Sequence, residues 1–395
     1  MSSDSRATAS STRPAGARAV GAAPAGGLRV ERLRLPESPD GADAVDFLEF
    51  SALTDAVQRQ IWGHEDRCSP PSYRLRVWRE SPYDSTSLFF VREAGRMVGR
   101  AWCRMPLKED LARAQVRAEV LDSHAGRGIG RLLLAAAVEE ARAHGRTVLD
   151  TFTEHPAETV PAGGGPFAVV PSTGTGAVPG DARSVRFARA AGFSLSQVTR
   201  FSELVLPPWS PAGGWADDGA WSALEEGAAA RGAGAYELLL WEGVPPEHRE
   251  GMAALFARMS TDAPQGEDRY EPEHWDADRV AALDAMLAAA DTVPLYAVAR
   301  HRASGAFAAY TALWVRGGKE DVADQDDTLV RAGHRGRSLG LWIKLANIRA
   351  YRERFPQARK VVTFNAAENA HMLAINEAIG FRPAGYDGEW FRRLA

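Results

Sequence analysis

The chain has 395 residues, of which 45% are hydrophobic and 25% charged, as in an ordinary globular protein long enough for two domains. Its net charge of −4 argues against a general binder of nucleic acids or membrane surfaces, because both need an excess of basic residues. Cys68 and Cys103 are too few for a disulfide framework or a zinc site, so we expect a cytoplasmic protein with reduced thiols and no metal.

Two segments differ in composition from the rest of the chain. Residues 1–27 are mostly Ala, Gly, Ser, Thr, Pro and Arg, which cannot bury enough apolar surface to fold, so we predict a disordered tail. Residues 207–214 are dense in Pro and Gly. They predict a linker at 207–220 between a domain at 28–206 and a second domain at 221–395.

Hydrophobic periodicity predicts the same kinds of elements, in the same order, on both sides of the linker. In the first part we expect strands at 28–35, 87–92, 97–105, 115–121, 147–153 and 197–206, and helices at 47–62, 130–144 and 184–191. In the second part we expect strands at 236–241, 294–300, 305–315, 326–330 and 360–364 and a closing strand after 381, with helices at 247–259, 340–355 and 369–378. The pattern is one mixed α/β unit used twice.

A long loop is the main predicted difference between the two parts. Val120 and Gly192 are 72 residues apart, whereas the equivalent Val330 and Gly380 are 50 apart. Residues 154–180 carry a dense set of Gly, Pro, Ser and Thr that is too long for a plain connection. The extra length of the first part therefore falls in this loop.

The most informative feature is a segment that occurs twice, with an offset of 210 residues. Residues 120–130 align with residues 330–340, and both copies contain a valine, a histidine, a glycine followed by an arginine, and a final glycine. Each copy runs from a predicted strand through a Gly/Arg turn into a predicted amphipathic helix. Small residues there let main-chain N–H groups approach an anion, and the helix start adds its positive dipole end. We therefore expect a phosphate-bearing ligand at one or both copies.

This order of strand, Arg/Gln-x-x-Gly-x-Gly/Ala turn, helix, strand and helix ending in Gly-Phe resembles GNAT-type N-acetyltransferases. The resemblance covers nearly everything from Leu28 onward, in a tandem arrangement similar to that of mycothiol synthase and other actinobacterial acetyltransferases. It implies two GNAT-type domains, each a mixed, mostly antiparallel α/β sheet flanked by helices. It also implies acetyl-CoA as co-substrate, with its pyrophosphate on the turn amides and its pantetheine arm paired to the preceding strand like an added strand.

The resemblance implies a set of cofactor-binding residues in each copy. In the second copy the set is Leu329, Val330, Arg335, Gly336, Arg337, Ser338, Leu339 and Gly340, with Asn365 and Asn369 as amides for the pantetheine or phosphate arm. In the first copy the set is Val120, Gly126, Arg127, Gly128, Ile129 and Gly130. Helix capping by an asparagine is an alternative role for the two amides.

The two copies depart from the family pattern in different ways. The first keeps Gly128 and Gly130 but has Ala125 where the family has Arg or Gln. The second keeps Arg335 but has Ser338 at the middle glycine. We expect the loss of an arginine that orders the main chain to matter more than the gain of a serine, so the second copy is the better predicted cofactor site. In the alternative interpretation, the glycines only permit a tight strand-to-helix turn.

The family often places a carboxylate about six residues before the motif valine, where it takes a proton from the ammonium form of the acceptor. In the second copy this residue is Asp324, and Asp326 is next on the same face by strand alternation. The first copy has Ala114 there and lacks the base. We predict Asp324 and Asp326 as catalytic residues, with a solvated acidic loop as the alternative.

Many GNAT enzymes protonate the leaving thiolate with a tyrosine four residues before the Gly-Phe glycine. Asn376 and Ala188 stand at these positions, and neither can supply a proton. Either the thiolate leaves unassisted or another group protonates it, and the candidates are Tyr310, Tyr386 and His334. We include Tyr386 among the predicted catalytic residues.

These features predict an acetyl-CoA-dependent N-acetyltransferase that acts in its second domain, where a primary amine attacks the thioester directly in a ternary complex. The first domain would be degenerate. The alternatives are an O-acyl or longer-chain acyltransferase and a non-catalytic acyl-CoA sensor or scaffold. We expect a small-molecule amine as acceptor, a monomer or homodimer, and no nucleic-acid or membrane partner. The acceptor itself does not follow from the sequence, because pocket-lining loops vary freely on one scaffold.

Overall fold

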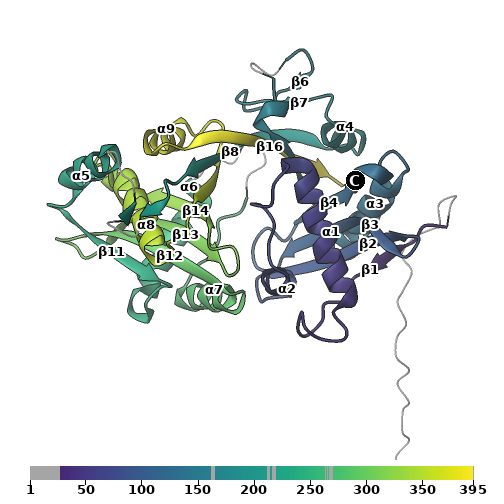
Figure 1. Cartoon of the computed structure of the whole chain (residues 1–395), viewed down its shortest axis with the longest axis horizontal. Helices are drawn as coiled ribbons and strands as arrows, with labels where there is room; N and C mark the ends of the chain where they lie inside the picture. The colour runs from purple at the N-terminus through teal and green to yellow at the C-terminus, as the bar shows by residue number, and fades with distance from the viewer. Residues whose placement is uncertain are drawn as a thin grey trace, which may run out of the picture.

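A single twelve-stranded sheet runs through the part of the chain that the computed structural model describes, with helices on both of its faces (Figure 1). The described residues are 27–394, except 162–164, 211–213, 216–218, 263, 265 and 267–269. The predicted tail at 1–27 therefore lies outside them, apart from Gly27. The predicted fold class, a mixed and mostly antiparallel α/β sheet flanked by helices and built from two similar units, is confirmed.

The first half of the sheet has one helix pair on each face. Its strands are β1 (Val30–Arg32), β2 (Asp84–Glu93), β3 (Arg96–Pro106), β4 (Arg113–Val120) and β5 (Val148–Pro156). One face is covered by α1 (Val45–Trp62) and α2 (Pro71–Trp78), and the other by α3 (Ile129–Ala143) and α4 (Arg183–Ala190). We call this set of elements the first module.

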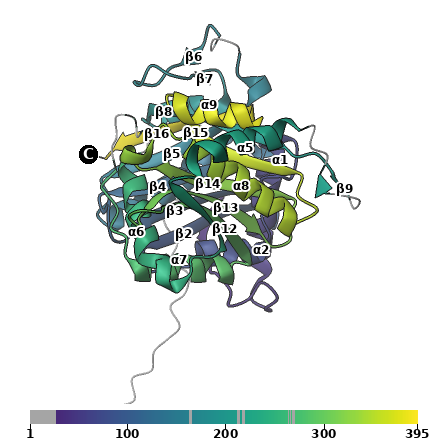
Figure 2. The same cartoon turned by 90° about the vertical axis from the view of Figure 1, so that its left-hand side faces the viewer.

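The second half repeats this arrangement and is called the second module. Its strands are β11 (Tyr236–Glu242), β12 (Thr292–His301), β13 (Phe307–Arg316), β14 (Val322–Val330) and β15 (Lys360–Ala366). One face carries α6 (Arg249–Asp262) and α7 (Ala277–Ala289), and the other carries α5 (Ala220–Gly232), α8 (Leu339–Arg354) and α9 (Ala370–Ile379). Figure 2, which faces this module, shows α8 and α5 in front of its strands.

The helices α2, α5 and α7 are absent from the sequence prediction. The helix α2 has only eight residues, which is too short for a clear apolar stripe. The helix α5 is rich in Ala and Gly, and it packs on α8 through Ala228 and Gly232 rather than through large side chains. Small residues of this kind leave little trace in a hydrophobic pattern.

The two modules exchange their last strands. Strand β8 (Ser194–Val205) follows α4 of the first module in the chain but pairs with β15 of the second. Strand β16 (Arg382–Arg393) follows α9 of the second module but pairs with β5 of the first. The two exchanged strands also pair with each other, so they join both half-sheets where Figure 1 shows them side by side. The modules therefore do not coincide with the predicted division at 28–206 and 221–395.

Two small hairpins occupy segments predicted as irregular. Strands β6 (Ala168–Val169) and β7 (Val178–Pro179) pair within the predicted loop at 154–180, and β9 (Trp209–Ser210) and β10 (Gly214–Trp215) pair within the predicted linker. Among the helices of the described residues, none combines the length and apolar character that crossing a bilayer requires.

The exchange predicts that both modules unfold together. Trp390 of β16 is 2% exposed, packs in the core of the first module and donates a hydrogen bond from Nε1 to Thr153 Oγ1 (3.0 Å). We expect Trp390→Ala to cost roughly 3–5 kcal/mol and to shift a single calorimetric transition, because one sheet couples both modules. Leu240→Ala on β11, where Leu240 is 47% exposed, is the control and should change stability by about 0.5 kcal/mol. Two separate transitions, with only one shifted by Trp390→Ala, would contradict this coupling.

Candidate functional site

The repeated segment has the same backbone in both modules. In the first, β4 ends at Val120 and a short 3-10 turn at Asp122–His124 leads to α3. In the second, β14 ends at Val330 and the equivalent turn at Ala332–His334 leads to α8. The residue before each helix is left-handed, with φ of 83° at Gly128 and 56° at Ser338.

Each turn presents a run of free main-chain donors. The first helical N–H to find an intrahelical partner is that of Leu132 in α3 and that of Trp342 in α8. Among the described residues, no hydrogen-bond acceptor faces the N–H groups of 126–131 or 336–341. The predicted residues Gly126 to Gly130 and Gly336 to Gly340 lie in these two runs, whereas Val120, Leu329, Val330 and Arg335 precede them. Free N–H groups at a helix start, together with the positive end of the helix dipole, form an anion site.

Ser338 keeps the glycine conformation at a cost. A left-handed φ destabilises a residue with a side chain by roughly 1 kcal/mol relative to glycine. The Ser338 hydroxyl accepts a hydrogen bond from Arg231 Nε (2.7 Å), which brings a cation from α5 to the mouth of the turn. The serine therefore preserves the turn and adds a polar contact with Arg231.

Carboxylates neutralise the cations at the first turn. Arg127 donates to Glu93 (2.7 Å between Nη1 and Oε2), and the same carboxylate lies 3.2 Å from His124 Nε2. Asp122 is ion-paired with Arg183 at 2.6 Å. An anion arriving here would have to compete with Glu93 and Asp122 for these side chains.

The second turn carries more uncompensated positive charge. Within the described part of the chain, Arg337 donates only to the carbonyls of Gly333 (3.2 Å) and Arg335 (3.3 Å), and Arg331 donates to a carbonyl of β13. Arg335 binds Val330 O (3.1 Å) and reaches Asp262 at 3.3 Å. Burial and the positive charges of His301, Arg331 and Arg337 lower the pKa of His334. This turn is therefore the better electrostatic site for a phosphate.

Both modules open a gap beside the strand that precedes the turn. The parallel pairing of β4 with β5 stops after Gln115, and that of β14 with β15 stops after Gln325, which is the equivalent position. Arg331 N donates to Ala308 O (2.9 Å), so strand alternation turns the main-chain groups of Val330 towards the gap. The same alternation holds for Val120. Each gap can accept an extended, amide-containing arm as an added strand.

Only one of the two gaps has a β-bulge at its start. The register between β13 and β14 shifts between Thr311 and Leu313, which places Asp326 and Asp327 opposite a single residue. The corresponding pairing of β3 with β4 is regular. A bulge redirects side chains and frees main-chain groups, and bulges are common beside active sites.

Three aspartates of β14 have different surroundings. Asp324 is ion-paired with the buried Arg316 at 2.9 Å. Asp326 is exposed to solvent, and local desolvation, with the charges of Asp327 and Asp324, raises the pKa of its carboxyl well above the usual range. Asp327 accepts a hydrogen bond from Tyr310 Oη (3.1 Å), and desolvation raises its pKa also. Asp326 is thus the aspartate that combines access with a high proton affinity.

The asparagines of the second module contact each other and the backbone. Asn376, which is fully buried at the position of the family tyrosine, donates from Nδ2 to Asn365 Oδ1 (2.7 Å). Asn369 caps α9 by accepting from Met372 N (3.3 Å). Asn365 therefore lies beside the gap, whereas Asn369 has the capping role that was weighed as the alternative.

Tyr386 lies away from these groups. It belongs to β16, pairs with His155 and Arg200, and packs against the core of the first module because of the strand exchange. The structure therefore does not bring Tyr386 together with Asp324 and Asp326. Among the described residues, no cluster of three His, Cys, Asp or Glu side chains could hold a metal ion.

A buried charged network in the first module was not predicted from the sequence. Glu154 of β5 is ion-paired with Arg67 (2.9 Å) and Arg117, and Arg117 also lies 2.8 Å from Glu119. These arginines hold the pKa of Glu154 at about 2 against the effect of burial. Polar residues alternate along β4 as they do on a strand with one solvent-exposed face. The only sign of the buried network in the sequence is therefore indirect: α1 and α2 must cover this polar face.

Residues 55–159 match the model of the Acetyltransferase (GNAT) family, and no curated protein matches. A solved tandem GNAT protein from the clavulanic acid biosynthesis pathway, determined without AcCoA, is 23% identical with a TM-score of 0.67, covering 93% of this chain and 99% of its own. A GCN5-related N-acetyltransferase from Sphaerobacter thermophilus is 16% identical with a TM-score of 0.58, covering 93% and 95%. These likenesses confirm the tandem GNAT fold.

The aspartates predict opposite stability changes in two variants. The pKa of Asp326 is raised from 3.8 by folding, so its charged form destabilises the fold increasingly as the pH rises above about 4. Asp326→Asn should therefore raise the unfolding temperature at pH 8 and change it little at pH 4. Asp324→Asn removes the partner of a buried arginine and should cost roughly 1–3 kcal/mol at pH 8. Thermal unfolding of both variants at both pH values checks this, and shifts of the same sign at pH 8 would contradict it.

Proposed function

We propose that this chain is a tandem GNAT acetyltransferase, an enzyme that moves an acetyl group from an acyl-CoA to an acceptor, because residues 55–159 match the GNAT family model and the fold is that of a tandem GNAT protein. We propose that the acceptor is a primary amine and that the second module catalyses the transfer. The observation that carries this proposal is the bulge at Asp326 and Asp327, which coincides with the start of the gap between β14 and β15. A phosphate cradle stands at the far end of the same strand.

The charge around the second turn supports the same module. Arg231, Arg331, Arg335 and Arg337 surround a run of free N–H groups there, with Asp262 as the neighbouring carboxylate. The family model covers the first module instead. That module keeps the family glycines, but Glu93 engages its turn arginine and its gap lacks a bulge.

Acidic groups near the bulge favour an amine as acceptor. Tyr310 and Tyr296 lie close to Asp326 and Asp327. Burial and the charges of these carboxylates raise the pKa values of both tyrosines well above the usual range. A cation is attracted by these carboxylates through charge, whereas a neutral hydroxyl acceptor would not gain this attraction.

In the proposed reaction, Asp326 takes a proton from the ammonium group, and the neutral amine attacks the thioester carbonyl. A raised pKa suits this role, because a general base works best when its pKa is near the working pH. Main-chain N–H groups beside the bulge stabilise the oxyanion of the tetrahedral intermediate. The intermediate then collapses to the amide and CoA thiolate, and the remaining extra proton of the attacking nitrogen passes to solvent. Since Asn376 cannot donate a proton, the thiolate leaves unprotonated, which its ordinary pKa of about 8.5 permits.

The first test compares the two turns. Arg335→Ala should weaken acetyl-CoA binding by roughly 10- to 100-fold, because a charge-assisted hydrogen bond contributes about 1.5–3 kcal/mol. Arg127→Ala is the matched control and should change the affinity by less than about threefold, since Glu93 already engages that arginine. Isothermal titration calorimetry measures both. Equal losses would refute the second module as the primary site.

The second test concerns the base. Asp326→Asn should lower kcat by roughly 10²- to 10⁴-fold and remove the acidic limb of the pH profile, while the affinity for acetyl-CoA stays unchanged. Asp324→Asn, at the carboxylate paired with Arg316, should have a smaller effect on kcat. Turnover with a panel of primary amines across pH 5–9 gives the comparison. If Asp324→Asn alone abolished turnover, the base would be Asp324, and acetyl-CoA binding without any turnover would favour a sensor.

A further inference from the structure

The first module contains a pocket of about 280 Å³ that the proposed reaction does not use. It lies on the face of the sheet covered by α1 and α2, and strands β3, β4 and β5 form its floor. Its polar lining is dominated by five arginines, which are Arg67, Arg74, Arg100, Arg104 and Arg117. So many guanidinium groups in one small space indicate a site for negative charge.

The carboxylates around the pocket do not balance these arginines. Asp55 pairs with Arg74 and Asp84 with Arg104, while Glu119 and Glu154 share the other three arginines. Five positive charges therefore face four negative ones. The count covers the carboxylates that pair with these arginines; burial and the charge of Glu154 raise the pKa of the nearby Asp387 well above the usual range.

Two arginines also retain donors without a partner. Arg100 is 4% exposed, and among the described residues nothing accepts from its Nε. Arg67 Nη1 is buried and equally unpartnered within the described part of the chain. A buried charged donor without an acceptor is costly, and an anionic group could supply one. Among the described residues, Gln58 Oε1 and the Glu119 carboxylate oxygens of the same network are also buried without a hydrogen-bond partner.

Aromatic rings form the other walls of the pocket. Trp78, Trp102, Phe152 and Tyr73 line it. Arg100 lies 5.1 Å from the ring centre of Trp102, and Arg117 lies 3.8 Å from that of Phe152. Flat rings beside guanidinium groups suit a ligand with a flat apolar body and one anionic end.

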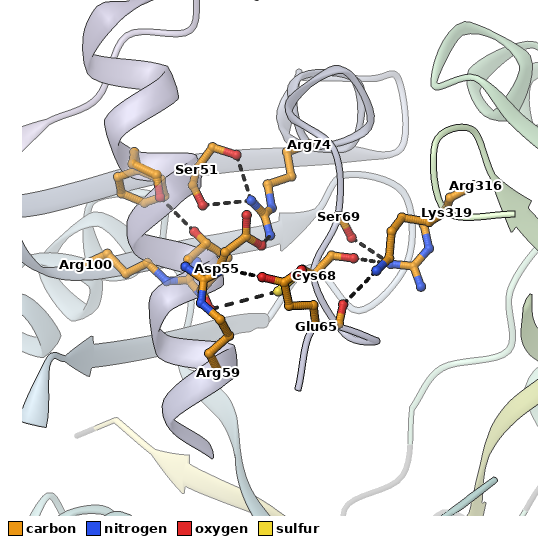
Figure 3. Close-up of polar contacts among 12 residues, drawn as sticks. Ser51, Asp55, Arg59, Glu65, Cys68, Ser69, Arg74, Arg100, Arg316 and Lys319 are labelled. Atoms are coloured by element: carbon orange, nitrogen blue, oxygen red, sulfur yellow. Dashed lines mark hydrogen bonds and ion pairs between the residues drawn. The ribbon is translucent and has the colours of Figure 1, made fainter. Parts of the chain in front are cut away.

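Tyr73, which lines the pocket, contacts the second module. Arg316 stacks 5.7 Å from the Tyr73 ring and pairs with Asp324, two residues before Asp326. The loop that carries Arg67 is held in place from the second module, since Arg316 donates to Ser69 Oγ (2.6 Å) and Lys319 to Glu65 O (2.9 Å) (Figure 3). A small molecule in the pocket would thus lie beside the proposed transfer site.

We propose that this pocket binds a small carboxylate with a flat apolar body. The carboxylate bonds to the free donors of Arg67 and Arg100, and the body packs between the aromatic walls. The carboxylate can belong to the acyl acceptor itself or to a separate effector, and the site is the same in both cases. The binding does not depend on the proposed function, because it needs no acetyl-CoA and no base.

Isothermal titration calorimetry with benzoate, benzamide and benzylamine tests the site on the full chain. Benzoate should bind at least tenfold more tightly than the neutral and cationic analogues. Arg67→Gln and, separately, Arg100→Gln should each weaken benzoate at least tenfold, with circular dichroism to check folding. Arg354→Gln, at an exposed arginine paired with Glu242 in the second module, is the matched control and should bind like the wild type. Equal affinity for benzoate and benzamide, or wild-type binding in both folded pocket variants, would overturn the proposal.

Acetyl-transfer assays then show whether the bound carboxylate belongs to the acyl acceptor or to a separate effector. If the acceptor supplies the carboxylate, 4-(aminomethyl)benzoate should have a kcat/KM at least tenfold above that of benzylamine, and benzoate should inhibit competitively. If an effector supplies it, benzoate should change kcat for benzylamine without competing. Benzoate binding that affects neither measurement would remove any functional role for the pocket. Absence of transfer to every amine would instead count against the proposed function, while calorimetry would still decide the pocket.

Discussion

The exchange of β8 and β16 sets the arrangement of everything else in this molecule. Each half-sheet is completed by a strand that the other half supplies, and the two strands pair with each other along their length. Separation of the modules would therefore break ladders on both sides of β8 and β16 and expose Trp390 and Phe201, which are 2% exposed. Independent motion of the two modules would need partial unfolding. Both gaps and the arginine pocket are thus held in fixed relative positions.

Within this frame, two copies of one backbone turn have diverged through their side chains. The N–H run and the left-handed residue before the helix are the same in both, even though Ser338 destabilises that conformation relative to a glycine. What differs is the surrounding charge, with Glu93 at one turn and Arg231, Arg331 and Arg337 at the other. A fixed backbone provides the geometry for an anion, and neighbouring side chains decide whether the anion binds.

Local patterns in the sequence predicted most of the elements and both turns. The periodicities of α3, α8 and most strands, and the strand–turn–helix order, depend only on residues that are close in sequence. The elements predicted from them therefore agree with the structure. The strand exchange could not be predicted, because β8 and β16 follow equivalent Gly-Phe turns and carry nothing local that specifies their partner. Tyr386 was placed beside the wrong module for this reason. The bulge at Asp326 depends on pairing with β13, which single-strand alternation does not describe.

The two modules present opposite charges on equivalent faces, and this contrast bears on how the chain works. The first keeps arginines under α1 and α2, and the second keeps aspartates and tyrosines beside α6 and α7. Buried ion pairs such as Arg117–Glu154 contribute little net stability, because desolvation offsets most of their attraction, and apolar residues of similar volume would often be more stable. A network with an excess arginine and unpaired donors is therefore better explained by a ligand than by folding. In the proposed scheme the first module recognises an anion, the second performs the transfer, and the exchanged strands keep the two sites in register.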